Sequence, residues 1–269
     1  STVGYEKLFN PALQFTDEDE FVRYILSDQP EAPKYFAVMK RVNKEGPEVI
    51  GDKGLPESQP IDDLSTALDS VTVIDLSPPA QFAEGHVPRT INITAAMLAG
   101  WAGWVVDYSK PAYLIADPSQ LPEATRVLRK IGLDDVRGYF DVSKVRDAGL
   151  ATETYATGTP KDLAPRIESG EVKLIDVRSD EEWKAGRIAE ADHRFLGRLP
   201  DNVSHIENSK PIVTQCQSGA RSAIAASILQ ANGLEVINMT GGFGAWADAG
   251  LPIEQSDAAS CEAGSQSCK

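Results

Sequence analysis

Apolar and polar positions follow the same order of elements twice along the chain. In each copy a β-rich apolar run ends in aspartate, and a polar segment with helical spacing follows it and closes at glycine. A second apolar run, a further helical segment, the pair Gly-Leu and a short strand complete the copy. Because strands alternate with helices, the pattern predicts an α/β fold in which a mostly parallel sheet is flanked by helices.

An internal repeat with an offset of about 100 residues accounts for this recurrence. The stretch VTVIDLSPPAQFAEGHV (71–87) aligns with VKLIDVRSDEEWKAGRI (172–188). Further on, SKPAYLIAD (109–117) aligns with SKPIVTQCQ (209–217). Matches that keep the same order, with a drift of one residue, indicate a duplicated unit. The sequence therefore predicts two homologous domains.

The repeat and its flanks predict four parts. We expect a leader helix and linker in residues 1–60, the first repeat in 61–155 and the second repeat in 156–256. The remaining residues, 257–269, are small, polar and rich in Gly and Ser, and we expect a flexible tail there.

The leader predicts one amphipathic helix. The stretch FTDEDEFVRYILSD has Thr16 as its expected N-cap, acidic residues in the first turn and an apolar stripe at Phe21, Val22, Ile25 and Leu26. The Pro- and Gly-rich stretch QPEAPKYFAVMKRVNKEGPEVIGDKGLPESQP follows, and it predicts an extended linker. A single helix cannot bury a core, so we expect the leader to dock on another structure.

Composition limits the class of partner. The chain has 269 residues, of which 42% are hydrophobic, and a net charge of −14, so nucleic acid and anionic membranes would repel it. No apolar run has the length of a membrane span, and the N-terminal STVGYEKLF lacks the basic-then-apolar pattern of a signal peptide. Three cysteines do not form a disulfide framework in a chain of this size. We therefore expect a cytoplasmic protein with no nucleic-acid or membrane partner.

Cys216 is the main candidate for chemistry. In PIVTQCQSGARSAIAAS (211–227) a β-branched run stops at the cysteine, small or polar residues follow, and Arg221 opens a helix that we expect to begin near Ser222. Loop N–H groups, the helix dipole and the guanidinium would all favour the nucleophilic thiolate. A buried structural cysteine is the alternative, but the small-residue loop and the arginine favour a functional one. The residues expected to hold a substrate are Gln217, Ser218, Gly219, Ala220, Arg221 and Ser222.

These features resemble the rhodanese domain. The resemblance rests on the strand–Cys–four residues–Arg–helix arrangement, on LIDVR, EEW and AGRI upstream, and on GGFGAWADAGLPIE downstream. It covers about residues 61–256 as a tandem pair. In that family a six-residue loop that starts at the cysteine goes with sulfur transfer, and a loop one residue longer goes with dual-specificity phosphatases and arsenate reductases. Cys216 through Arg221 is six residues, which favours sulfur.

The resemblance implies a two-step transfer of sulfane sulfur through a Cys216 persulfide. The donor would be thiosulfate or a low-molecular-weight persulfide, and the acceptor would be a thiol, sulfite or cyanide. The implied partners are thus small sulfur-containing anions and low-molecular-weight thiols. No cofactor is implied, and no His, Cys and carboxylate cluster has metal-ligand spacing. A thiolate-based phosphatase or arsenate reductase, and a non-enzymatic sulfur-carrier or regulatory module, remain as alternatives.

Arg178 is the second candidate site residue. It lies two residues after Asp176, at the end of the first strand of the repeat, where the rhodanese resemblance implies a substrate-binding arginine. A salt bridge to Asp180 or Glu182 is the alternative role. We expect Asp176 to be structural, because the first repeat keeps the equivalent Asp75.

Two further features predict structural roles. Ser179 and Glu182 have the spacing of a capping box, with Gly186 as the expected helix stop. The motif GGFGAW predicts a glycine turn with Trp246 packed on the core as structural support.

The first repeat lacks the residues of this chemistry. Ile115, Ala116 or Asp117 stands where the nucleophile would be, and Ser77 replaces Arg178. Two prolines in ADPSQLPEATR remove N–H donors from the corresponding loop. We expect this copy to be a non-catalytic scaffold that covers the active face of the second repeat.

The leader has a resemblance of its own. The stretch TVGYEKLFNPALQFTDEDEFVRYILSDQPEAPKYFAVMKRVN resembles the C-terminal end of the metallo-β-lactamase-fold half of persulfide dioxygenase–rhodanese fusion proteins. The resemblance implies a dioxygenase half as a partner, with iron held in that upstream domain. In the tail, Cys261 and Cys268 could accept the persulfide sulfur, although incidental exposed thiols are expected there.

Overall fold

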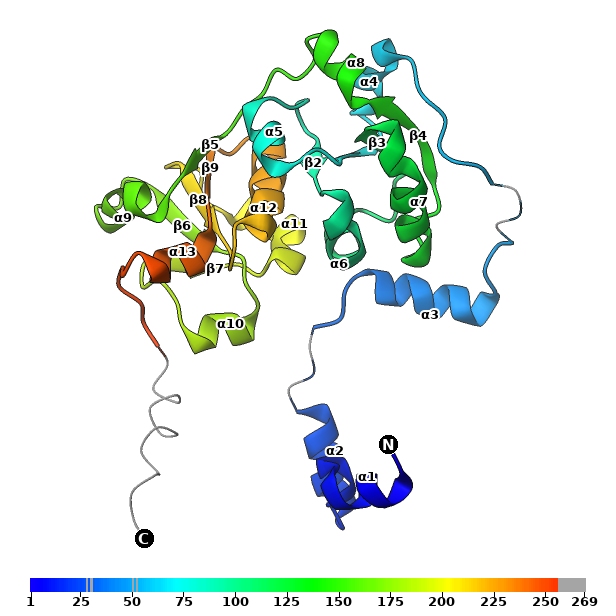
Figure 1. The fold of residues 1–269 in the computed structure, drawn as a ribbon, viewed down its shortest axis with the longest axis vertical. Helices are drawn as coiled ribbons and strands as arrows, with labels where there is room; N and C mark the ends of the chain where they lie inside the picture. Colours follow the sequence, from blue (N-terminus) through cyan, green and yellow to red (C-terminus); the bar gives the residue numbers. More distant parts are fainter. Residues whose placement is uncertain (28, 30, 50, 52, 256–269) are drawn as a thin grey trace.

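The structure is a computed structural model, which describes residues 1–27, 29, 31–49, 51 and 53–255. Within these residues it contains two parallel β-sheets with helices around each (Figure 1). The expected α/β class with two mostly parallel sheets is confirmed. The predicted tail, with Cys261 and Cys268, lies outside the described residues.

The first sheet has the strand order β2-β1-β3-β4, the second has β5-β9-β8-β6-β7, and all pairs are parallel. Every residue of β8 and of β9 is buried, as expected for Val- and Ile-rich strands that helices cover on both faces. The strands are β1 (Thr72–Asp75), β2 (Ile91–Asn92), β3 (Ala112–Ala116), β4 (Val136–Asp141), β5 (Ala156–Gly158), β6 (Lys173–Asp176), β7 (Ala191–His193), β8 (Ile212–Gln215) and β9 (Val236–Met239).

Helices precede, connect and cover the strands. Those before and around the first sheet are α1 (Val3–Phe9), α2 (Glu18–Leu26), α3 (Tyr35–Glu45), α4 (Leu64–Ala67), α5 (Pro79–Glu84), α6 (Ala95–Val105), α7 (Leu121–Lys130) and α8 (Val142–Asp147). Those around the second sheet are α9 (Pro160–Glu168), α10 (Asp180–Ala185), α11 (Leu199–Asn202), α12 (Ala220–Ala231) and α13 (Gly242–Asp248). Short 3-10 helices are η1 (Pro11–Leu13), η2 (Ile61–Asp63), η3 (Pro118–Gln120), η4 (Leu196–Arg198) and η5 (Val203–His205).

The two sheets repeat the same contacts at the sequence offset of the repeat. His86 forms an isolated antiparallel bridge with Glu153, and Arg187 forms the same bridge with Glu254. The strand order of the first sheet also recurs in the second, where β7, β6, β8 and β9 correspond to β2, β1, β3 and β4. The internal sequence repeat therefore has a counterpart in backbone pairing.

The first sheet begins earlier than the sequence predicts. Ser58 pairs in parallel with Tyr139 of β4, whose N–H donates to the carbonyl of Glu57 at 2.9 Å. The N–H of Gln59 donates to the carbonyl of Tyr139 at 2.8 Å. This segment occupies the place on β4 that β5 occupies on β9. Residues 57–59 therefore belong with the first sheet, although the sequence assigned them to the linker.

The linker is only partly extended. Its central stretch forms α3, because its apolar residues recur at helical spacing and find a surface to cover. Tyr35 fills the space above Gly103 of α6, and Met39 lies over Gly132, which follows α7. The predicted helix before it is confirmed as α2, but its N-cap is Asp17, which accepts from the N–H of Glu20 at 2.9 Å.

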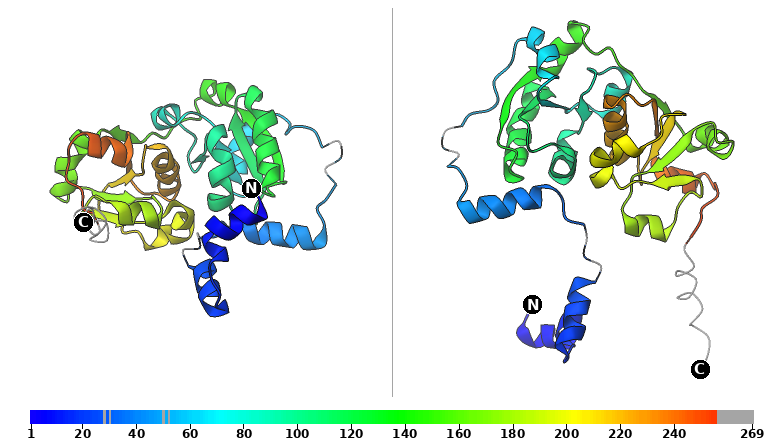
Figure 2. Two further views of the ribbon diagram at one scale, coloured as in Figure 1. Left: turned by 60° about the horizontal axis from the view of Figure 1, so that its bottom comes forward. Right: turned by 180° about the vertical axis from the view of Figure 1, so that it is seen from behind.

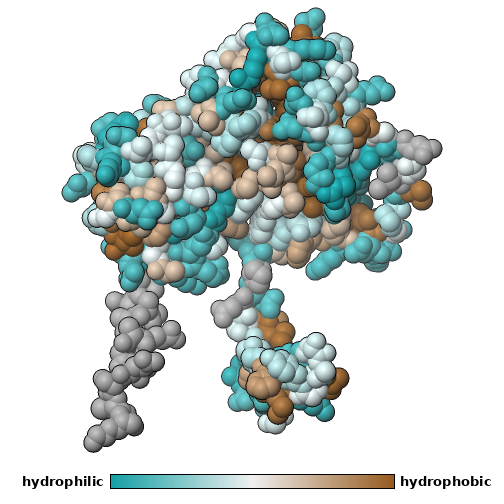
Figure 3. Space-filling view, viewed as in Figure 1, coloured by the Kyte–Doolittle hydropathy of each residue, from teal (hydrophilic) through white to brown (hydrophobic). Residues whose placement is uncertain are grey.

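The helices α1 and α2 stand apart from the sheets (Figures 1 and 2). The apolar side chains of α2 are partly exposed, from 39% for Phe21 to 67% for Leu26. Apolar patches are visible on this protruding segment in the space-filling view (Figure 3). The expected docking of the leader helix is therefore not formed within the described part of the chain.

One apolar core connects the two sheets. It includes Ile93, which follows β2, and Ile224 of α12, which lies between the sheets (Figure 1). Trp104 of α6 packs edge-on against Phe195, with ring centroids 5.2 Å apart.

Across the described ranges, no helix combines the length and the apolar character that a membrane crossing needs.

Candidate active site

The turn from β8 into α12 places Cys216 at the carboxyl edge of the second sheet. Gly219 is the N-cap of α12 and has a φ of 95°, a left-handed value that suits glycine. Its N–H donates to Cys216 Sγ at 3.2 Å. The helix begins at Ala220, two residues before the expected start near Ser222, so Arg221 belongs to its first turn.

The Cys216 side chain is fully buried, and its residue belongs to the apolar core that connects the sheets. The sequence predicts a ring of N–H groups around this sulfur. In the described residues the amide that donates to it is that of Gly219. Gln217 and Ser218, the next residues of the loop, are exposed. The cysteine thus lies directly beneath an accessible loop.

Arg221 is paired with a carboxylate that the sequence does not predict as its partner. Its Nη1 and Nη2 donate to Glu182 Oε2 and Oε1, both at 2.6 Å. This pairing raises the pKa of Arg221, and the nearby Cys216 contributes a smaller effect in the same direction. The hydrogen bonds from Arg221 lower the pKa of Glu182 to about 2. Arg221 is therefore beside the sulfur, but its charge is shared.

Glu182 has two roles in this arrangement. The predicted capping box is confirmed, because the Ser179 hydroxyl accepts from the Glu182 N–H at 3.2 Å and Glu182 Oε2 accepts from the Ser179 N–H at 3.0 Å. The same carboxylate holds Arg221. The capping motif was the available signal, and it gave no indication of the second contact.

Ser222 stabilises the cysteine loop through a buried hydrogen bond to Asn238. Its residue is fully buried, and its hydroxyl donates to Asn238 Oδ1 at 2.6 Å. Asn238 Nδ2 in turn donates to the carbonyl of Gly219 at 3.4 Å. A substrate-binding role was expected for Ser222. That role stays a prediction; in this structure the hydroxyl has a protein partner and no exposed surface, an arrangement that positions the loop.

The glycine turn at the start of α13 also supports the loop. The N–H of Phe243 donates to the carbonyl of Cys216 at 2.7 Å, and that of Gly244 donates to the carbonyl of Gln217 at 3.0 Å. A Cβ at Gly242, whose φ is 56°, would lie 2.0 Å from the Cys216 carbonyl oxygen. The GGFGAW motif is therefore a support for the cysteine loop as well as a turn.

Comparison with known proteins agrees with this geometry. A family model described as the rhodanese-like domain matches residues 159–249. The putative sulfurtransferase YtwF of Bacillus subtilis is 38% identical over 85 residues, which cover 31% of this chain and 82% of that protein. The chain belongs to the rhodanese family. Sulfurtransferases are thus among its relatives.

Two longer matches are to proteins that carry other names. The HTH-type transcriptional regulator Rv0324 of Mycobacterium tuberculosis is 33% identical over 146 residues, which cover 49% of this chain and 65% of that protein. A crystal structure titled metallo-beta-lactamase, from Staphylococcus aureus, is 31% identical, with a TM-score of 0.43, and the match covers 52% of this chain and 40% of that one.

Arg178 is buried within the second repeat, where its guanidinium contacts only protein groups among the described residues. It is 1% exposed, its Nη2 donates to Asp176 Oδ2 and to the carbonyl of Gly186, both at 2.7 Å, and its guanidinium lies 3.9 Å from the centre of the Phe243 ring. In this structure the guanidinium of Arg178 is therefore occupied by protein partners, and its role in substrate binding stays a prediction. The alternative of a salt bridge holds, but the partner is Asp176 rather than a carboxylate of α10.

The other two residues expected to be structural are buried. Asp176 is fully buried and accepts from the backbone N–H of Arg178 at 2.9 Å as well as from its guanidinium. Trp246 is 3% exposed, and its Nε1 donates to the carbonyl of Pro252 at 2.9 Å. Both arrangements are those that a supporting role requires.

The first sheet carries Ala116 where the rhodanese site carries Cys216. Ile115 pairs with the last residue of β1, and Gln215 pairs with the last residue of β6, so the residues that follow them correspond. Asp117 then caps η3 by accepting from its backbone. Of the three candidates in the first repeat, the strand register therefore identifies Ala116 as the equivalent of Cys216. Its methyl side chain cannot act as a nucleophile.

A pocket of about 550 Å³ lies between the first sheet's α5 and the cysteine loop. On one side it is lined by Ala80, Ala83 and Glu84, and on the other by Ser218 and Gly219. The first repeat thus forms one wall of the space beside the rhodanese loop. No group of three or more His, Cys, Asp or Glu residues in the described ranges could hold a metal ion.

Proposed function

We propose that this rhodanese transfers sulfane sulfur from thiosulfate or a low-molecular-weight persulfide to a thiol, sulfite or cyanide through a persulfide on Cys216. The observation that carries the proposal is the hydrogen bond from the Gly219 N–H to Cys216 Sγ, in a six-residue loop that ends at Arg221. A backbone donor at the sulfur and a nearby cation both stabilise a thiolate.

The chemistry needs two displacements. In the first, the Cys216 thiolate attacks the outer sulfur of thiosulfate, the sulfur–sulfur bond of the donor breaks, and sulfite leaves with the electron pair. In the second, an acceptor thiolate attacks the outer sulfur of the persulfide, and Cys216 leaves as a thiolate. Because Cys216 is buried, the exposed residues Gln217 and Ser218 must move aside to admit a donor.

The pocket beside the loop supports organic thiols as donors or acceptors. Its volume of about 550 Å³ exceeds what thiosulfate needs, and it falls in the usual range of small-molecule sites. We infer that the first repeat is a non-catalytic scaffold. Its α5 forms a wall of this pocket, and Ala116 stands at the position of the cysteine.

Intact-mass measurement after incubation with thiosulfate tests the proposal. A gain of one sulfur atom that Cys216→Ser abolishes would support it. The Cys261→Ser/Cys268→Ser double variant is the matched control, and it should keep the gain. Turnover of a phosphotyrosine analogue without sulfur uptake would favour the thiolate-phosphatase alternative. Absence of both activities would favour a regulatory module.

A further inference from the structure

A second pocket lies at the same edge of the sheet as Cys216. It has a volume of about 300 Å³ and lies where β7 ends, between α10 and η4. Because β6 alone separates β7 from β8, the pocket is roughly 10 Å from the cysteine along the sheet. Its lining residues are Asp180, His193, Arg194, Phe195, Arg198, Leu199 and Asn202.

Arg194, one of the two arginines that line the pocket, shares the carboxylate of Asp192 with Lys173, and neither of these two partners lines the pocket. Asp192 lies 3.1 Å from the Nζ of Lys173 and 3.1 Å from the Nε of Arg194. Within the described residues, the pair with Asp192 uses the Nε of Arg194, so its Nη atoms can serve another anion. Among the residues that line the pocket, the two arginines Arg194 and Arg198 therefore outnumber the one carboxylate, Asp180.

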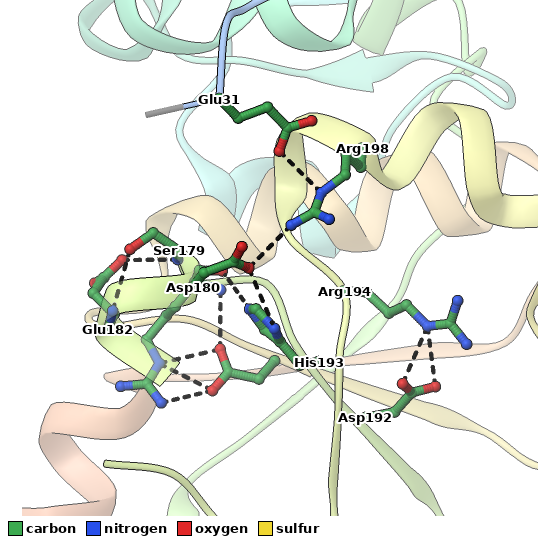
Figure 4. Close-up of polar contacts among 10 residues, drawn as sticks. Glu31, Ser179, Asp180, Glu182, Asp192, His193, Arg194 and Arg198 are labelled. Carbon is green, nitrogen blue, oxygen red and sulfur yellow. Dashed lines mark hydrogen bonds and ion pairs between the residues drawn. The ribbon is translucent and has the colours of Figure 1, made fainter. Parts of the chain in front are cut away.

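Arg198, the other arginine that lines the pocket, forms an ion pair with a carboxylate of the leader as well as with one of its own domain. Its Nη2 lies 3.0 Å from Asp180 Oδ1, and its Nε lies 3.0 Å from Glu31 Oε2. Figure 4 shows Glu31 and Asp180 approaching the Arg198 guanidinium from different sides, with the His193 ring directed at Asp180. The pocket thus binds one carboxylate that its own domain does not supply.

The Glu31 contact is suited to replacement. Glu31 and Arg198 are 45% and 47% exposed, so water and salt screen their attraction. An arginine fork binds any carboxylate of suitable geometry. A small molecule that brings its own carboxylate can therefore take the place of Glu31 without any change in the fold.

We propose that this pocket is a carboxylate subsite for the sulfur substrate, occupied by Glu31 until an acidic thiol or persulfide binds. The inference rests on the proposed function, since it is Cys216 that makes the substrate a thiol. A tripeptide-sized thiol extends over about 10 Å, which is comparable with the separation of β7 and β8, the strands that lead into the pocket and into the cysteine loop. The leader segment would then act as an internal competitor for acidic substrates.

Calorimetric titration with S-methylglutathione tests the subsite apart from catalysis. This thioether keeps both carboxylates of glutathione but cannot accept sulfur, and its diethyl ester is the matched probe that has no carboxylate. The wild-type protein should bind the acid more tightly than the ester. Arg198→Gln should weaken binding of the acid about three- to tenfold and leave the ester unchanged.

Two leader variants complete the test. Glu31→Gln should tighten binding of S-methylglutathione by a few-fold, because the competitor is gone. Glu45→Gln removes the same charge from an exposed pair with Arg41 on α3, and it should change nothing. Equal binding of acid and ester, or identical affinities in wild type, Arg198→Gln and Glu31→Gln, would overturn the subsite.

Sulfur uptake from thiosulfate, measured on the same preparations, separates the two proposals. If Cys216 takes up sulfur while acid and ester bind equally, the subsite is wrong and the transferase stands. If Arg198→Gln weakens binding of the acid and not of the ester, but Cys216 takes up no sulfur, the carboxylate subsite stands and the transferase is wrong.

Discussion

Arg221 and Glu182 form a two-pronged ion pair beside the cysteine, with both nitrogen–oxygen distances at 2.6 Å. The pair joins the first turn of α12 to the first turn of α10, and so fixes the loop that carries Cys216 against the neighbouring strand connection. Glu182 thus determines where the guanidinium lies relative to the sulfur.

This ion pair predicts an acid-sensitive contribution to stability. The pKa of Glu182 is about 2 in the folded protein, against 4.5 for the ordinary side chain, so the contribution is complete above about pH 4.5 and is lost as the pH falls towards 2. At pH 6, Glu182→Gln should lower the free energy of unfolding by about 1 kcal/mol. Urea unfolding of both proteins should show the difference shrinking between pH 5 and pH 2. A difference that is constant with pH would contradict the account.

Gly242→Ala should disable the cysteine loop. The new Cβ would lie 2.0 Å from the Cys216 carbonyl oxygen, so the loop or α13 must move. Gly250→Ala is the matched control, since Gly250 has a φ of 70° and an added methyl group there would meet no atom within 4 Å. Both variants should lose about 1 kcal/mol of stability from left-handed strain. Only Gly242→Ala should abolish sulfur uptake in the mass assay. Equal uptake by both variants would show that the turn at the start of α13 does not support the cysteine loop.

Arg178→Gln distinguishes a brace from a substrate contact. Removing the guanidinium leaves Asp176 buried without its cation, which should cost about 3 kcal/mol of folding free energy. Arg166→Gln, in an exposed pair with Glu171, should cost less than about 1 kcal/mol. Chemical denaturation measures both. A variant of normal stability that has only a raised KM for thiosulfate would support the substrate-binding role.

His86 should make the protein less stable in mild acid. Burial lowers its pKa below the usual value of 6.5, while its Nδ1 donates to the Phe82 carbonyl at 2.7 Å. Below pH 6.5 the His86 imidazole therefore binds a proton more readily in the unfolded chain than in the folded protein. The free energy of unfolding consequently falls as the pH drops below 6.5. Unfolding at pH 7.5 and pH 5.5 should show a smaller decrease for His86→Gln than for wild type. The exposed His205→Gln should behave like wild type.

The sequence was sufficient for the fold and for the position of the cysteine. Parallel strands buried on both faces leave a plain apolar signature, and the duplication shows it twice. The capping box of α10 was also predictable, because Ser179 and Glu182 are close in sequence. Features that depend on neighbours along the chain were therefore available from the sequence.

Contacts between distant segments were not available in this way. Arg221 and Glu182 are 39 residues apart, and a capping glutamate gives no sign of a second partner. The α3 helix lies in a Pro- and Gly-rich stretch, and it depends on the surfaces at Gly103 and Gly132 that Tyr35 and Met39 cover. Tertiary packing decides such features, and local propensity does not.

The assignment of sulfur chemistry to Cys216 is the central claim, and persulfide discharge tests it most directly. The Cys261→Ser/Cys268→Ser protein is incubated with thiosulfate and its intact mass is measured. It is then treated with cyanide, and the intact mass is measured again. The account predicts one added sulfur per chain, lost on cyanide treatment with an equal amount of thiocyanate formed, and no addition to the Cys216→Ser form. A double variant that gains no sulfur, or a Cys216→Ser protein that still gains it, would contradict the account.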